Sequence, residues 1–335
     1  MIAMALLKRL TTAAGTLAGV AVVVFVLLRI VPGDPVAMMI SPGASASDIA
    51  VLRAHYGLDG SLLSQFGLWL QSLFKGDLGV SISLRRNVLE VLLERLPATL
   101  ELCVAALEFA VLLGGTVAVV GTIWRNSWVE ELIDTGNGLL LAVPDFVWAL
   151  ALVLFFGVLF PVLPLSGRLD PSVSSGMITP FFWAESLLRL RFDVFADLSR
   201  HLAMPVLALG LPLAAVIARV LKGALIEAMA QDYVLLAQLK GMSQVRLVLQ
   251  EALSNALGPT LALTGVQFTF LVGGTVITER IFAYPGIGNM AIDAVINRDL
   301  PLIQGLVLVF AVIFIAVNML VDLLQLVFNP RLRHG

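Results

Sequence analysis

Six long, almost uninterrupted apolar stretches most constrain what this 335-residue chain can fold into. Each can hold the roughly 20 helical residues that cross a hydrocarbon core about 30 Å thick. Barrel strands would alternate apolar and polar residues, whereas helices satisfy their own backbone hydrogen bonds in lipid. The sequence therefore predicts an all-α polytopic membrane protein with six transmembrane helices, at residues 10–31, 99–123, 136–162, 201–221, 259–279 and 302–328.

The composition supports this class. Only 13% of the residues are charged and the mean hydropathy is +0.98, whereas a soluble domain has about 25% charged residues. The net charge of −2 carries no partner signal, and no basic patch in the sequence suggests a nucleic-acid partner. Lys8 and Arg9 precede an uncharged stretch that exceeds the 7–15 apolar residues of a typical signal peptide, so we expect an uncleaved first span.

The order of apolar and polar stretches also predicts the organisation of the chain. We expect loops 32–98, 163–200 and 280–301 on one side of the membrane, and 124–135, 222–258 and both termini on the other. The basic residues near both ends favour cytoplasmic termini. The predicted regions are a first span with its long periplasmic loop (1–98), a five-helix core with a cytoplasmic segment at 222–258 (99–330), and a cytoplasmic tail (331–335).

The polar segment 222–258 carries a second helical pattern. Its apolar residues recur with the spacing of an amphipathic helix, at Val245, Val248, Leu249, Ala252, Leu253 and Ala256. Ser243 is placed to cap this helix, Gly241 to break the chain before it, and Pro259 to sit in the first turn of the next span. We expect a short helix over 243–257 at the membrane surface. The pattern alone fits a docking site for another protein and a helix packed on the bundle equally well.

Motifs for chemistry are missing from the sequence. It contains no G-x-x-x-x-G-K-[ST] phosphate loop, no H-E-x-x-H pair and no G-x-S-x-G elbow, and the single cysteine, Cys103, has no partner. We therefore expect no catalytic residue, metal site or cofactor in this chain. Carboxylates in apolar stretches are costly and often functional. We favour pairing inside the bundle for most of them, and name Glu108, Asp145 and Gln267 as candidates for a translocation path.

Several stretches together resemble one family. Asp232, Tyr233, Val234, Ala237, Lys240, Gly241 and Ser243 fit the pattern D-Y-V-x-x-A-x-x-K-G-x-S, found in a cytoplasmic loop of dipeptide/oligopeptide/nickel permeases of ABC importers. Where the wider importer class has E-A-A, this chain has Leu235, Leu236 and Ala237. Further stretches similar to this family's first ("B"-type) permease subunit are LLRIVPGDP (27–35), GDLGVS (76–81), RLPATLEL (95–102), ALSNALGP (252–259), ERIFAYPGIG (279–288), RDLPLIQG (298–305) and VNMLVDLL (317–324).

The resemblance implies a type I importer permease fold, like that of methionine permeases, and alternating access driven by ATP. A coupling helix near 237–250 would rest on a separate ATPase subunit, with coupling residues Asp232, Tyr233, Ala237, Lys240, Gly241, Ser243 and Arg246. The implied partners are a second homologous permease, one or two ABC ATPase subunits that bind ATP and Mg, and an external binding protein. Peptides are the favoured substrate; nickel complexes, glutathione, oligosaccharides or a stand-alone secondary transporter are alternatives.

Overall fold

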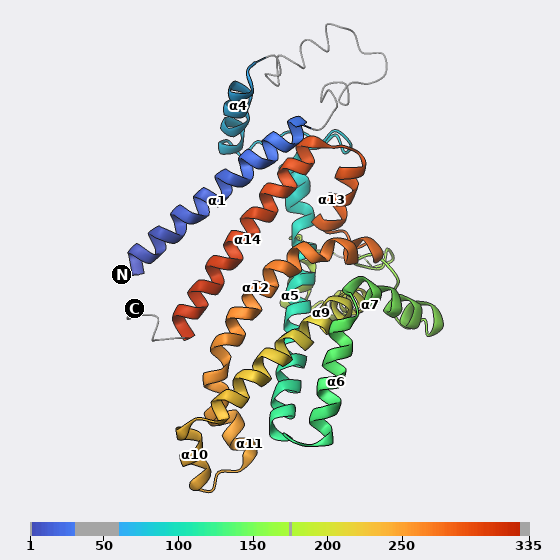
Figure 1. Ribbon diagram of the computed structural model, residues 1–335. Helices are drawn as coiled ribbons and strands as arrows, with labels where there is room; N and C mark the ends of the chain where they lie inside the picture. The colour runs from blue at the N-terminus through green and yellow to red at the C-terminus, as the bar shows by residue number, and fades with distance from the viewer. Residues whose placement is uncertain (1, 31–59, 174–175, 329–335) are drawn as a thin grey trace. The chain divides into compact units, whose positions relative to one another are not determined.

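The computed structural model describes residues 2–30, 60–173 and 176–328 (Figure 1). The predicted helical class is confirmed: within these ranges the regular structure is helical, apart from one isolated β-bridge between Val80 and Asn87. Five helices are long and apolar enough to cross a membrane, and one bent pair makes a sixth span if it is counted as one. The chain separates into two compact units, one with residues up to Leu96 plus Met290–Ile313, the other with Pro97–Asn289 plus the residues from Phe314 onward.

Unit 1 contains α1 (Ile2–Ile30), α4 (Leu62–Phe74), and parts of α5 (Val88–Ile123), α13 (Ile287–Ile296) and α14 (Leu300–Phe328). The Asp299 carboxylate fastens the start of α14 to the segment before α5, because it accepts hydrogen bonds from the Ser81 hydroxyl (2.6 Å) and from the Ser83 hydroxyl (2.6 Å) and amide (2.9 Å). Burial opposes ionisation of Asp299, but these bonds outweigh it and lower the pKa of the carboxyl.

Unit 2 is built around the long helix α9 (Phe192–Met229), which packs against α12 (Leu253–Ile281), α7 (Asp145–Leu152), α6 (Trp128–Ala142) and α8 (Phe182–Leu188). Small residues let α5 and α9 approach closely. A side chain at Gly114 would overlap the Ala214 backbone, and one at Gly210 would overlap the Phe109 ring. Pro205 and Pro212 lie inside α9 without ending it, as expected for proline in a membrane bundle.

The third predicted span is wrong as a single helix over 136–162. Helix α6 ends at Ala142, and the next helix, α7, continues directly into a π-helix, η1 (Val153–Leu159). The chain bends by 97° between α6 and the α7–η1 half. Pro144 explains the break, since proline lacks an amide hydrogen and forces the preceding residue out of helical geometry. Val143 is accordingly extended (φ −101°, ψ 122°). Pro144 therefore produces a sharp bend, and the helices on its two sides form an interrupted span.

The short helix predicted over 243–257 is not separate from the fifth span. Helices α11 (Gln244–Arg246), η2 (Leu247–Ala252) and α12 form one helical segment through Ile281. Pro259 therefore lies inside this segment rather than in its first turn. The reason is packing. Val248, Ala252 and Ala256 are buried in a cluster with residues of α9, and these contacts keep the segment before Pro259 continuous with α12. Of the predicted apolar face, Val245 and Leu249 are exposed instead.

Candidate functional site

The sequence expected to bind a partner folds as a short helix between two breaks. Helix α10 (Asp232–Leu239) follows the extended residue Gln231, and the chain turns again at Gly241, whose φ is +84°. Glycine enters this left-handed region without the steric cost that other residues carry. Figure 1 shows α10 and α11 together at one end of unit 2. The segment 237–250, for which the resemblance implies a coupling helix, covers the end of α10, the turn at Gly241, α11 (Gln244–Arg246) and part of η2, and its role stays a prediction.

One face of α10 holds it against the rest of unit 2. Val234 and Ala237 are buried in a cluster with Leu247, against which Met229 and Met242 also pack. The Tyr233 hydroxyl accepts a hydrogen bond of 2.8 Å from the Asn255 amide on α12. Apolar contacts and a hydrogen bond thus tie α10 to the ends of α9 and α12, so a force on α10 acts on both long helices.

The opposite face of α10 is apolar and exposed. The exposed fractions are 55% for Leu235, 59% for Leu236 and 78% for Leu239. We call these three residues the α10 leucines. They stand in or near the positions where the wider importer class has its E-A-A motif, and the sequence-based list of coupling residues omitted them. The sequence signal that could have revealed them is three leucines within an eight-residue helix, because so short a helix cannot bury all its sides.

The structure divides the predicted coupling residues by location. Asp232, Tyr233, Lys240, Gly241 and Arg246 are exposed. Ala237 is buried and contributes packing rather than a contact surface. Ser243 occupies the N-cap position of α11 with extended geometry, but its hydroxyl makes no capping bond within the described chain. Their role in coupling stays a prediction.

A buried ammonium group near the same end links α6 to α9. Lys222 Nζ lies 2.7 Å from Glu130 and 2.8 Å from Asp134, both on α6. The sequence pattern placed Lys222 in a polar cytoplasmic segment, whereas the residue is only 8% exposed. The reason is that α9 runs to Met229, so Lys222 lies within the helix and reaches acids on its neighbour.

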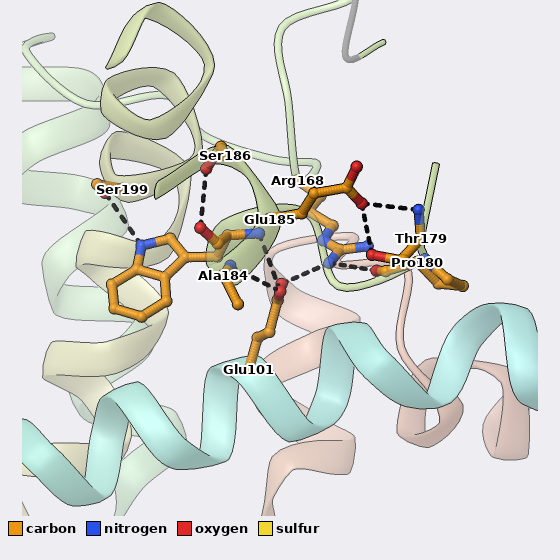
Figure 2. Close-up of polar contacts among 9 residues, drawn as sticks. Glu101, Arg168, Thr179, Pro180, Ala184, Glu185, Ser186 and Ser199 are labelled. Atoms are coloured by element: carbon orange, nitrogen blue, oxygen red, sulfur yellow. Dashed lines mark hydrogen bonds and ion pairs between the residues drawn. The ribbon is translucent and has the colours of Figure 1, made fainter. Parts of the chain in front are cut away.

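A second polar cluster pins the loop between η1 and α9 (Figure 2). The Arg168 guanidinium makes an ion pair with Glu101 on α5, and both side chains are buried. Arg168 also donates to the Pro180 carbonyl (2.9 Å) and lies 4.3 Å from the centre of the Phe182 ring. The same Glu101 carboxylate accepts from the Trp183 amide at 2.9 Å, so one acid both neutralises Arg168 and caps the start of α8.

Glu185 continues this cluster on the other side of α8. Its carboxylate accepts from the Ile178 amide (2.9 Å) and from the Thr179 amide (2.7 Å) and hydroxyl, and it pairs with Arg189 (2.7 Å). Hydrogen bonds from the Ile178 backbone first, and then from Thr179, lower the pKa of Glu185 to about 2. Two acids, Glu101 and Glu185, therefore fix the described parts of this loop.

Glu279 has a structural role as well. It is fully buried and accepts from the Thr99 hydroxyl (2.6 Å) and the Asn289 amide (2.8 Å), while the Ile287 amide donates to Thr99 (2.9 Å). A side chain at Gly286 would overlap the Glu279 carboxylate, so the Pro-Gly turn closes tightly over it. We favoured a charged partner for most carboxylates in apolar stretches, whereas a hydroxyl and a backbone amide donate to Glu279.

The translocation-path candidates come from three helices of unit 2. Glu108 on α5 is exposed, while Asp145 on α7 and Gln267 on α12 are partly buried. Asp145 begins the second half of the interrupted span, and its carboxylate accepts from the Phe146 amide (2.8 Å). Helix α7 packs against both α9 and α12. The described contacts do not join the three side chains, and their role stays a prediction.

Comparison with known proteins identifies the family. Residues 110–334 match the model of the binding-protein-dependent transport system inner membrane component, and residues 1–103 match the N-terminal model of the same systems. The chain is 38% identical to a di/tripeptide transport system permease of Pseudomonas aeruginosa, over 98% of each chain. It is 35% identical to a dipeptide permease of Escherichia coli and to a glutathione permease of Salmonella paratyphi A, again over 98% of each chain.

A solved structure supports the fold separately. An inward-facing methionine ABC transporter chain aligns with a TM-score of 0.53 at 15% identity, over 69% of this chain and 93% of that chain. The sequence matches extend through the α10 segment and the spans on either side of it. The chain therefore belongs to the binding-protein-dependent transport system inner membrane components and is an ABC importer permease.

Proposed function

We propose that this permease forms half of the path by which a dipeptide, or a closely related small solute, enters the cell. The support is the agreement of names among relatives that match over nearly their whole length: di/tripeptide, dipeptide and glutathione permeases. Glutathione is the second candidate, since three of these relatives carry that name. An external binding protein would deliver the solute and set most of the selectivity.

The α10 surface supports the coupling of this path to a partner, because it offers an apolar contact on a helix whose other face is packed on unit 2. Val234 and Ala237 fix α10 to Leu247, and the helix that begins at Gln244 continues to Ile281. A partner that grips the α10 leucines and then shifts would drag the ends of α9 and α12 with it. When two ATPase subunits close on each other, the partner would shift in this way. We expect the path to open at the end of the permease away from α10.

The assembly follows from the same view. A second homologous permease completes the path, one or two kinds of ABC ATPase subunit bind ATP and Mg, and this chain contributes no catalytic residue. The α10 surface and both termini lie in the cytoplasm. Glu108, Asp145 and Gln267 line the path, where Asp145 at the bend is suited to the amino group of a peptide.

A pair of matched substitutions tests the coupling surface. Leu239→Glu places a charge on the α10 leucines, where the exposed fraction is 78%, and Leu188→Glu makes the same change at the 83% exposed end of α8. Each variant is tagged and purified in mild detergent, and the co-purifying chains are identified by mass spectrometry. Binding-protein-dependent dipeptide uptake into proteoliposomes with internal ATP is measured in parallel.

We expect Leu239→Glu to reduce recovery of the ATPase subunits roughly 10- to 100-fold, the effect of burying an unpaired charge at an interface. Leu188→Glu should retain the ATPases. Equal recovery from both variants would remove the coupling role of α10. Uptake that persists without ATP, by the chain purified alone, would instead support a stand-alone secondary transporter.

A further inference from the structure

Helix α4 has three faces of different character. Its 13 residues, LLSQFGLWLQSLF, include no charged side chain. At about 100° per residue, a first face carries Phe66 and Trp69, a second carries Leu63, Leu70 and Phe74, and a third carries Ser64 and Gln71 beside the half-exposed Leu68. We call the second group the α4 apolar face. Its end residues Leu63 and Phe74 are each 84% exposed.

The contacts of Phe66 and Trp69 indicate how deep α4 lies in the membrane. The Phe66 and Trp69 rings lie 5.2 Å and 5.7 Å, centre to centre, from the ring of Phe25 on α1. Phe25 belongs to the apolar window Arg9–Val26 that makes α1 a candidate span. Figure 1 likewise shows α4 beside the C-terminal part of α1. Helix α4 thus covers a residue of the span itself.

Side chains of α1 at the same level are uncovered. Val22, Val23 and Val26 are 47%, 54% and 45% exposed, and each lies within about 4.5 Å of Phe25 along the helix axis. In a membrane component, side chains of a spanning helix at this level lie in the apolar layer. The aromatic face of α4 therefore lies level with that layer rather than in water beyond the membrane.

The rest of α4 cannot be far from that level. Leu63 and Phe74 are at most about 9 Å from Trp69 along the axis of α4, whichever way the helix points. This distance is similar to the 5–10 Å depth over which interfacial helices bury their apolar side. Lys75 follows the helix directly and is exposed, as suits a cation that reaches lipid phosphates.

We propose that α4 is an interfacial helix whose apolar face, Leu63, Leu70 and Phe74, is immersed in the lipid headgroup–acyl boundary. The occupant of this face is the bilayer, because α4 packs on a residue of the apolar window of α1 and its apolar face has no charged group to meet a protein's. The Ser64 and Gln71 face then points to water. Anchored in this way, α4 fixes the start of the segment that leads to Ser81, Ser83 and Asp299.

Site-directed spin labelling tests this placement. Single cysteines replace Leu63 and Phe74 on the apolar face, Gln71 on the water face, and Val23 on α1 as a lipid standard, in the full permease assembled with its partner subunits in phosphatidylethanolamine–phosphatidylglycerol nanodiscs. The background is Cys103→Ala. Because Cys103 is buried, the native background serves as a second one if the alanine variant folds poorly. Collision rates of each label with oxygen and with a water-soluble nickel chelate are measured.

Labels at positions 63 and 74 should resemble the label at 23, with nickel collisions roughly fivefold lower than at 71 and oxygen collisions higher, as for an immersed face. Nickel collisions at 63 and 74 equal to those at 71 would overturn the proposal. Protection that develops only when purified binding protein is added would also overturn it, by assigning the face to a protein partner.

Discussion

At the scale of single residues, the Glu101–Arg168 pair is where one substitution should matter most. Glu101→Gln leaves the Arg168 guanidinium buried without a counter-charge and weakens the cap of α8. Removing one partner of a buried pair costs roughly 3–5 kcal/mol. We expect a lower melting temperature in detergent and faster proteolysis within 163–191.

The same helix offers a matched control for this prediction. Glu94 on α5 pairs with Arg86, and both side chains are more than half exposed (54% and 52%). Glu94→Gln should therefore change stability by less than about 1 kcal/mol. Similar melting temperatures for the two variants would mean that Glu101 does not hold the loop.

The Glu101–Arg168 pair also shows why residue contacts were harder to predict than residue classes. Buried carboxylates were expected to be paired, and Glu101 is. Its partner lies 67 positions later in the chain, in a loop whose course depends on the bend at Pro144. Lys222 is a similar case, since its acids on α6 become neighbours only through helix packing.

At the scale of elements, Gly241 gives a prediction about α10. Its φ of +84° is costly for residues with a Cβ, although an added Cβ would meet nothing within 4 Å. Gly241→Ala should therefore act through backbone strain alone, by about 1 kcal/mol. Amide hydrogens of α10 should exchange roughly fivefold faster, if opening of the turn exposes them. The measurement is hydrogen exchange with mass spectrometry on the assembled permease.

Two glycine controls separate strain from other effects. Gly241→Asn should be milder than alanine, because asparagine tolerates the left-handed region. Gly223→Ala, at a helical position in α9 with open space around it, should leave the exchange of α10 unchanged. An alanine at 241 that behaves like the one at 223 would show that the turn is not under this constraint.

Elements differed in how far the sequence determined them. Apolar length predicted the spans well, because lipid enforces helices of about 20 residues. Ends and breaks were less predictable. Pro144 and Pro259 are both prolines in apolar stretches, yet one bends the chain by 97° and the other lies within a continuous helix. The difference comes from packing, since Val248, Ala252 and Ala256 anchor the helix before Pro259 to α9. Helix propensity, which is a local property of the sequence, does not include such packing.

At the scale of the whole molecule, unit 2 brings two kinds of surface to opposite ends. The end with α10 presents the exposed side chains of Lys240 and Arg246 as well as the α10 leucines. At the end with α8, Arg189 and Arg191 are paired with Glu185 and Asp193. The Gly167 amide also donates to the Phe282 carbonyl there (2.9 Å), so the two loops predicted on one side of the membrane do meet.

This asymmetry predicts which side of the membrane each end faces. Lysine and arginine near short loops are retained in the cytoplasm, so a cysteine at Leu239 should react with a membrane-impermeant maleimide only after the membrane is opened. A cysteine at Leu188 should react in intact spheroplasts. Both side chains are strongly exposed, and Cys103 is buried, so differences in labelling report sidedness rather than burial. The reversed pattern would place α10 outside the cell, where no ATPase could reach it, and would end the coupling proposal however well the fold matches.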